Sequence, residues 1–281
     1  MPRAPLLAAL AVAATGGVLY APVVARLVRD WISDPDYAHG LLVAPFVLYL
    51  IWQRRKPLLE LPLAGRAAGW PLLLAGIGLL ALGTLGIELF LTRLSLIVVV
   101  AGLVVCLAGW RHLRLLAFPL ALLTLTIPLP AIIVTRITLP LQLLASKTAE
   151  SALMILHVPI LREGNVLVLP NGVLQVAEAC SGIRSVFALL TLTLIAARSL
   201  ERRTGARLAI VASAVPIAVV VNGARVTATA LAAYWLGAST ATGPWHEVGG
   251  LCLFVVAFAV VMALARRISR HDTRISEAVA T

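Results

Sequence analysis

Eight long apolar runs dominate the sequence and limit the folds that it can adopt. A membrane-spanning helix needs about 20 mostly apolar residues, and most of these runs reach that length. Hydrophobic residues make up 61% of the chain and charged residues only 12%, about half the charged share of a soluble domain. We therefore predict an all-α polytopic membrane protein. The predicted spans lie near residues 5–28, 40–53, 69–88, 93–110, 113–133, 182–199, 207–236 and 247–265.

The first run is too long for the core of a signal peptide, so we expect it to remain as the first span. No shift in composition divides the chain, which predicts a single integral-membrane domain over residues 1–281 with a cytoplasmic tail at 266–281. The net charge of +11 could suggest nucleic-acid binding. The basic residues instead form short clusters between the apolar runs, as the positive-inside rule requires, so we predict no nucleic-acid partner.

The orientation follows from the same basic clusters. With a cytoplasmic N-terminus and eight spans, both termini are cytoplasmic, and 15 of the 23 basic residues fall on that side. Eight of the 12 acidic residues fall on the other side. The two distributions agree, which supports this topology. It places the segment 134–181 outside the cytoplasm.

That external segment contains two predicted features. Residues 136–157 are apolar at roughly helical spacing with a few polar positions, which predicts a helix that lies in the membrane interface or dips into it. The Asn171-Gly172 pair stands between two runs rich in β-branched residues, which is a strong hairpin signal over 166–176. Pro170 restricts its strand to an edge position. The hairpin leads directly to Cys180.

Cys180 is the cysteine with polar neighbours. Cys106 and Cys252 fall within apolar runs, and three cysteines form no disulfide framework. Cys180 precedes the sixth span by two residues, where free N–H groups and the helix dipole lower a thiol pKa. Arg184 adds positive charge one turn later. A small interfacial cysteine without function is the alternative interpretation.

Two later residues suit thiol chemistry on the same side of the membrane. Arg225 lies about 27 Å along the seventh span, near its outer end, and an arginine at membrane depth is a candidate functional residue. His246 precedes the eighth span on the same side. A nucleophile, a cation and a proton-transfer group are the minimum set for acyl transfer. An arginine extending to lipid headgroups and an interfacial histidine beside Trp245 are the alternatives.

Three further residues are weaker candidates. His39 opens the second span on the outer side and could line the same cavity, or act with Tyr37 and Trp31 as an interface anchor. Glu178 could orient a catalytic side chain or remain solvated. With Arg184, these residues form a candidate substrate-binding set. The five histidines are scattered without metal-ligand spacing, so we predict no metal and no cofactor.

The chain resembles the exosortase/archaeosortase family of membrane transpeptidases. The resemblance rests on Ala-Cys-Ser-Gly-Ile-Arg at 179–184, Asn-Gly-Ala-Arg at 222–225 and His246, and it covers about residues 30–265. Tyr37-Ala38-His39-Gly40, Trp-Gln-Arg-Arg at 52–55 and Arg-Glu-Gly-Asn at 162–165 reinforce it. After His246 the chain has Glu-Val-Gly-Gly rather than the aromatic sequence typical of the family, which leaves the subtype open.

The resemblance implies a cysteine enzyme of the inner membrane in a bacterium of the Gram-negative type, with its active site facing the periplasm. Its substrates would be membrane-anchored exported proteins with a C-terminal Pro-Glu-Pro sorting signal, in cells that produce exopolysaccharide. Cys180 would be the nucleophile, Arg225 the thiolate and oxyanion stabiliser, and His246 the proton-transfer group. The acceptor stays open among water, an amine and a glycan hydroxyl. A transporter or flippase subunit for polysaccharide export and a structural subunit are the alternatives.

Overall fold

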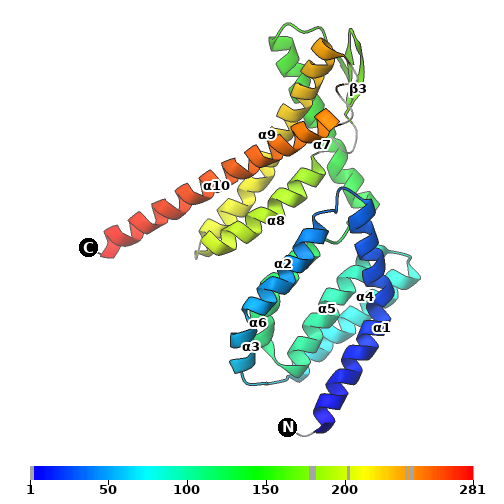
Figure 1. Ribbon diagram of the computed structural model, residues 1–281, viewed down its shortest axis with the longest axis vertical. Helices are drawn as coiled ribbons and strands as arrows, with labels where there is room; N and C mark the ends of the chain where they lie inside the picture. The colour runs from blue at the N-terminus through cyan, green and yellow to red at the C-terminus, as the bar shows by residue number, and fades with distance from the viewer. Residues whose placement is uncertain (1–2, 177–181, 201–202, 238–239, 241–243, 281) are drawn as a thin grey trace. The chain divides into compact units, whose positions relative to one another are not determined.

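The computed structural model describes residues 3–176, 182–200, 203–237, 240 and 244–280 (Figure 1). The chain divides into two compact units, Met1–Ala131 and Ile132–Thr281. Each unit is described by itself below. The prediction of a single domain over the whole chain stays a prediction.

The first unit is helical, and its tightest packing joins α4 to α5. The two helices meet through glycines, because a Cβ added at Gly76 would lie 2.5 Å from Val99, and one at Gly102 would lie 2.8 Å from the Leu73 backbone nitrogen. Small residues allow such close approach between membrane helices. The helices of this unit are α1 (Arg3–Ser33), α2 (Gly40–Gln53), α3 (Arg55–Glu60), the 3₁₀ helix η1 (Ala67–Gly69), α4 (Trp70–Leu85), α5 (Leu89–Leu107) and α6 (Trp110–Thr124).

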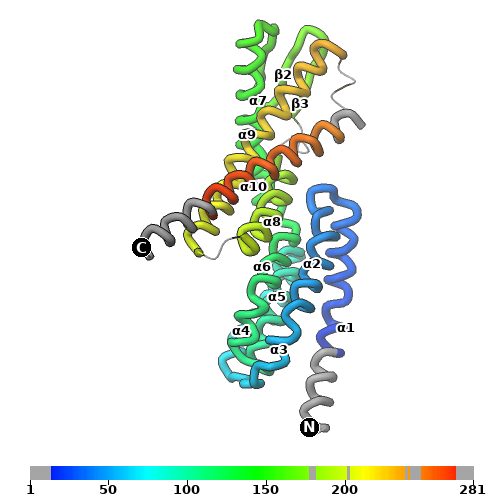
Figure 2. Tube along the Cα trace, turned by 60° about the vertical axis from the view of Figure 1, so that its left-hand side comes forward, coloured from blue at the N-terminus to red at the C-terminus, as the bar shows by residue number. Residues whose placement is uncertain are grey.

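In the described part of the second unit, four helices combine with a small sheet. Its elements are α7 (Ala131–Ile155), β1 (Leu161–Glu163), β2 (Val166–Leu169), β3 (Gly172–Gln175), α8 (Ile183–Leu200), α9 (Thr204–Leu236) and α10 (Pro244–Ala280). Helices α8, α9 and α10 lie side by side in both views (Figures 1 and 2). Leu189 and Val261 pack there against Ala214, Ala218 and Ala257. The alanines bring the three backbones close together, which positions the site described below.

The sheet is antiparallel in the order β1-β2-β3. Leu167 and Leu169 are buried in a core that includes residues of α7 and α9. Polar contacts add to this packing: the Asn171 side chain donates to the Tyr234 carbonyl on α9 at 2.5 Å. Arg162 pairs with Glu150 on α7 at 2.6 Å. The sheet is thus attached to both helices.

Two sequence predictions for residues 113–157 need correction. The predicted run 113–133 is not one helix, because α6 ends at Thr124 and α7 begins at Ala131. Pro128 and Pro130 lie between them, and proline removes a backbone donor and disfavours helix before it. The predicted interfacial helix at 136–157 corresponds to α7, which spans Ala131–Ile155 and so begins five residues and ends two residues earlier than predicted. Its position relative to the bilayer stays a prediction.

The hairpin differs from the predicted turn by one residue. Leu169 pairs with Gly172, so Pro170 and Asn171 form the two-residue connection. A further strand, β1, precedes it, and Gly164 in the β1–β2 turn adopts φ +66°. Glycine accepts this left-handed conformation without steric cost.

Five helices among the described residues are long and apolar enough to cross a bilayer, and together they support a multi-pass membrane protein. These helices are Ala67–Leu85, Leu89–Leu107, Ile183–Leu200, Thr204–Leu236 and Val248–Ser269. Helix α2 has the predicted bounds but only 14 residues. The count of eight spans stays a prediction.

Candidate active site

The segment that carries Cys180 is anchored on both sides. Residues 177–181, which include Cys180 and Glu178, lie outside the described part of the chain. Just before them, Val176 is 1% exposed. Its N–H donates to the Asn165 carbonyl at 2.9 Å, and its carbonyl accepts from the Asn165 side chain at 3.1 Å. The sheet therefore holds the chain firmly at the entry to the cysteine segment.

Gly182 holds the exit from that segment. It is buried with φ +80°, and its carbonyl accepts from Val186 N–H at 2.8 Å in the first turn of α8. A Cβ at this position would lie 2.7 Å from Asn222 Cγ on α9. Both the backbone conformation and the contact require glycine. Two peptide bonds after Cys180, the chain is thus pressed against α9.

Asn222 and Arg225 lie one turn apart on α9 and so share a helix face. Asn222 is 5% exposed and Arg225 is partly buried. The Arg225 guanidinium passes α10 at Gly250, where an added Cβ would lie 3.1 Å from Cζ and from Nη2. Gly250 therefore makes room for the guanidinium between the two helices.

The backbone of His246 belongs to α10, four residues before Gly250. Positions four apart on a helix lie one above the other. The side chain of His246 is outside the described part of the structure. The structure therefore relates the backbone of α10 near His246 to Arg225, and the role of His246 stays a prediction.

Two hollows meet at Arg225. One is a small cavity of about 10 Å³ between α8, α9 and α10, lined by Ser185, Asn222, Arg225 and Gly250 with apolar neighbours. That volume holds about one water molecule. The other is a groove of about 450 Å³ between α9 and α10. Its lining is mostly apolar and includes Ala228, Ala232 and Leu253, with Arg225 at one end. Arg225 can therefore act on a group held in an apolar groove.

Of the remaining predicted residues, Arg184 is exposed in the first turn of α8. His39 belongs to the first unit, where its Nε2 contacts the Leu125 carbonyl at 3.1 Å. A carbonyl only accepts, so Nε2 carries the proton in this contact. A contact within its own unit agrees with the anchor interpretation. Membership of His39 in the Cys180 site stays a prediction.

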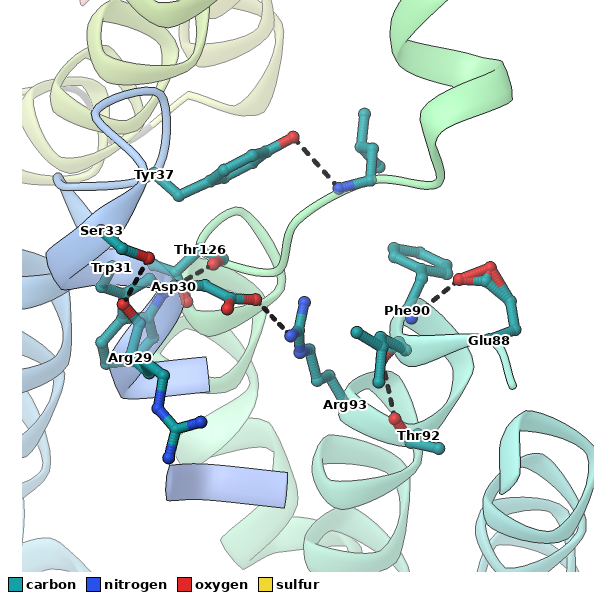
Figure 3. A network of polar contacts seen from close by, with 12 residues as sticks. Arg29, Asp30, Trp31, Ser33, Tyr37, Glu88, Phe90, Thr92, Arg93 and Thr126 are labelled. Carbon is teal, nitrogen blue, oxygen red and sulfur yellow. Dashed lines mark hydrogen bonds and ion pairs between the residues drawn. The ribbon is translucent and has the colours of Figure 1, made fainter. Parts of the chain in front are cut away.

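The anchor interpretation extends to the neighbours of His39. Trp31 is buried and donates to the Thr126 carbonyl at 2.8 Å, and Tyr37 accepts from Leu129 N–H at 3.2 Å (Figure 3). Burial raises the pKa of the Tyr37 phenol above its ordinary value, although the Leu129 bond opposes this effect. These side chains hold the turn between α1 and α2.

Sequence reasoning assigned no role to two residues of the candidate site, Gly182 and Gly250, because their contacts depend on helices that are far apart in the sequence. Asn222 belongs to the Asn-Gly-Ala-Arg motif at 222–225, and an amide within an apolar span is costly unless it faces protein. Across the described residues, no group of three His, Cys, Asp or Glu side chains is placed to hold a metal ion.

A family model described as transmembrane exosortase matches residues 31–263. No curated protein and no solved structure matches the chain. The matched range covers most of each unit and every candidate residue from His39 to His246.

Proposed function

Because the chain belongs to the transmembrane exosortase family, a family of membrane transpeptidases, we propose that it cleaves and transfers exported proteins through a Cys180 thioester. One observation carries this proposal: Asn222 and Arg225 form a single surface on α9 that contacts Gly182 on one side and Gly250 on the other. Gly182 follows Cys180 by two residues, and Gly250 follows His246 by four. Two segments that are distant in the sequence, at Gly182 and at Gly250, thus meet one turn of α9.

Covalent geometry supports the role of Cys180. Consecutive Cα atoms lie about 3.8 Å apart, so the Cα of residue 180 is within about 7.6 Å of Gly182. Gly182 packs on Asn222, which is one turn from Arg225. In the proposed site, the Arg225 guanidinium stabilises the Cys180 thiolate as a nearby cation.

In the proposed first step, the Cys180 thiolate attacks the scissile carbonyl. A C–S bond forms, the C–N bond breaks, and His246 donates its proton to the leaving amine. Arg225 stabilises the thiolate and then the oxyanion, because guanidinium keeps its charge and offers fixed donors. In the second step, an acceptor attacks the thioester and gives its proton to His246, which releases the thiolate.

Three features around the proposed site suit the binding of substrate. The apolar groove between α9 and α10 suits the hydrophobic segment that follows the scissile bond in a membrane-anchored protein. Strand β3 is an edge strand that ends at Gln175, five residues before Cys180, and its Val173 is exposed. An extended recognition motif can pair with such an edge. Arg184, exposed at the start of α8, suits the acidic residue of a Pro-Glu-Pro motif.

The proposal also covers the cellular location of the protein and its partners. The family resemblance and the positive-inside distribution support a bacterial inner-membrane protein with its active site on the periplasmic side. Its partners would be exported proteins with a C-terminal sorting signal, and the acceptor would be water, an amine or a glycan hydroxyl. A link to exopolysaccharide production belongs to the same proposal.

A polysaccharide transporter or flippase subunit is the competing proposal. Such a protein needs polar groups through the bundle to a midplane site. Beyond the small cavity, the described core of α8, α9 and α10 contains Leu189, Ala214, Ala218, Ala257 and Val261. The buried polar side chains of α8 are the uncharged Thr191 and Thr193. A core without buried charge favours an enzyme with its chemistry at one end.

The test is covalent trapping on the full chain. Cells that co-express a sorting-signal protein should accumulate a thioester adduct, and Cys180→Ala should abolish both adduct and processing. Cys252→Ala, at an exposed cysteine, is the matched control and should behave as wild type. Arg225→Ala should lower processing at least about a hundredfold, and Arg225→Lys by less, because lysine keeps the charge without the planar fork. Processing by Cys180→Ala would exclude the mechanism.

A further inference from the structure

The first unit contains a buried arginine within a helix that can cross the membrane. Arg93 is 3% exposed, near the start of α5, and forms an ion pair with Asp30 of α1. Figure 3 shows the Asp30 carboxylate pointing at the Arg93 guanidinium. An intramembrane arginine is costly and is by default a sign of function. A guanidinium has five N–H donors, so an arginine that is paired with one carboxylate can still donate to a second anion.

A groove of about 350 Å³ lies beside Arg93, between α1, α4 and α5. Its charged lining consists of Arg26 and Arg93, and no acidic residue lines it. Arg26 is exposed and forms no ion pair within the described part of the chain. Thr84 and Thr92 add hydroxyls, and most of the remaining lining is apolar, including Pro22, Val23 and Leu80.

The groove lies at the turn between α4 and α5 and along residues 19–26 of α1. It is lined by residues 80–84 near the end of α4 and by residues 89–93 at the start of α5. Both are candidate spans, so this turn corresponds to the boundary between acyl chains and headgroups. A soluble anion would match only the arginines. A ligand that carries phosphate at one end and hydrocarbon at the other matches the whole lining.

We propose that this groove binds one anionic phospholipid. Its phosphate contacts Arg26 and Arg93, and the first part of one acyl chain lies on Leu80, Pro22 and Val23. Asp30 holds the Arg93 guanidinium in place and offsets part of its charge, so that Arg26 supplies the net positive charge that selects an anionic headgroup.

The proposal is tested with purified full-length protein in detergent, with bound dioleoylphosphatidylglycerol measured by native mass spectrometry. Wild type should retain one lipid per chain. Arg26→Gln should weaken retention about tenfold, because a charge-assisted contact to phosphate is lost. Arg29→Gln is the matched control and should retain the lipid, since it removes the same charge one turn away. Figure 3 shows that the Arg29 side chain extends away from the Asp30–Arg93 pair.

Further measurements distinguish a bound phospholipid from other anionic ligands. Leu80→Trp narrows the apolar part of the groove and leaves Arg26 and Arg93 unchanged. It should also weaken retention of the lipid. Inorganic phosphate should not displace the lipid, and dioleoylphosphatidylcholine should bind more weakly than phosphatidylglycerol. Equal retention by wild type and Arg26→Gln would overturn the proposal, as would equal losses in Arg26→Gln and Arg29→Gln. Full displacement by inorganic phosphate would show an anion site without a lipid.

Discussion

At the scale of single residues, two adjacent glycines of α10 have different surroundings. A Cβ at Gly250 would meet the Arg225 guanidinium at 3.1 Å, whereas a Cβ at Gly249 would meet nothing within 4 Å. We predict that Gly250→Ala displaces the guanidinium by a few tenths of an ångström and lowers transpeptidation about tenfold, because catalysis depends steeply on such placement. The measurement is the rate of sorting-signal cleavage by purified variants.

Gly249→Ala provides the control for this prediction. Both substitutions add the same helix propensity, so any shared effect on folding cancels between them. Gly249→Ala adds a methyl to the lining of the groove without touching a neighbour, whereas Gly250→Ala crowds the Arg225 guanidinium. Equal activity of the two variants would show that the position of Arg225 does not limit the reaction.

The sequence identified Cys180 and Arg225 as candidates because each is a polar group beside or within an apolar run. It could not predict the contacts of Gly182 and Gly250, because each glycine packs on a side chain of α9 that is distant in the sequence. Asn222 lies between these cases. Its polarity is visible in the sequence, but its packing on Gly182 depends on how α8 meets α9.

At the scale of elements, the end of α7 contains a residue in a strained conformation. His157 has φ +58°, and the bonds from His157 N–H to Met154 and from Val158 N–H to Leu153 form a Schellman motif. A side chain in this left-handed region costs about 1–2 kcal/mol. We predict that His157→Gly stabilises the protein by about 1 kcal/mol, measured as a higher midpoint of thermal unfolding in detergent.

Gly164 offers the reverse substitution in the same unit. It has φ +66°, and a Cβ there would meet nothing within 4 Å, so Gly164→Ala changes only the backbone preference. It should destabilise the protein by about the amount that His157→Gly gains. If the two variants shift the midpoint in the same direction, backbone preference does not explain either effect.

Apolar runs of spanning length predicted most of the described helices, and α2 has the predicted bounds. It failed where α6 passes into α7, because hydropathy treats Pro128 and Pro130 as part of one apolar run although neither suits a helix interior. The hairpin turn lies one residue earlier than predicted, and a proline is again involved. The Asn171-Gly172 pair is a strong turn signal, but the pairing of Leu169 with Gly172 places Pro170 in the turn instead.

At the scale of the whole molecule, the number of membrane crossings depends on α6. Helices α4 and α5 are both candidate spans. Two crossings in succession return the chain to the side of the membrane on which α4 begins. Helix α6 has 15 residues, which is about 22 Å of helix against a hydrocarbon core of about 30 Å. The sequence counts apolar runs, but it does not show whether a short helix crosses with the help of local thinning.

We predict that α6 and the residues after it do cross, so that Pro62 and Val173 lie on opposite sides of the membrane. Arg111 and Arg114 at the start of α6 favour a cytoplasmic position for that end. Both test positions are exposed in the fold. In a background without the three native cysteines, Val173→Cys should react with an impermeant maleimide in spheroplasts. Pro62→Cys should react only after permeabilisation. If both react in intact spheroplasts, the chain crosses an even number of times between them, and the eight-span topology is wrong.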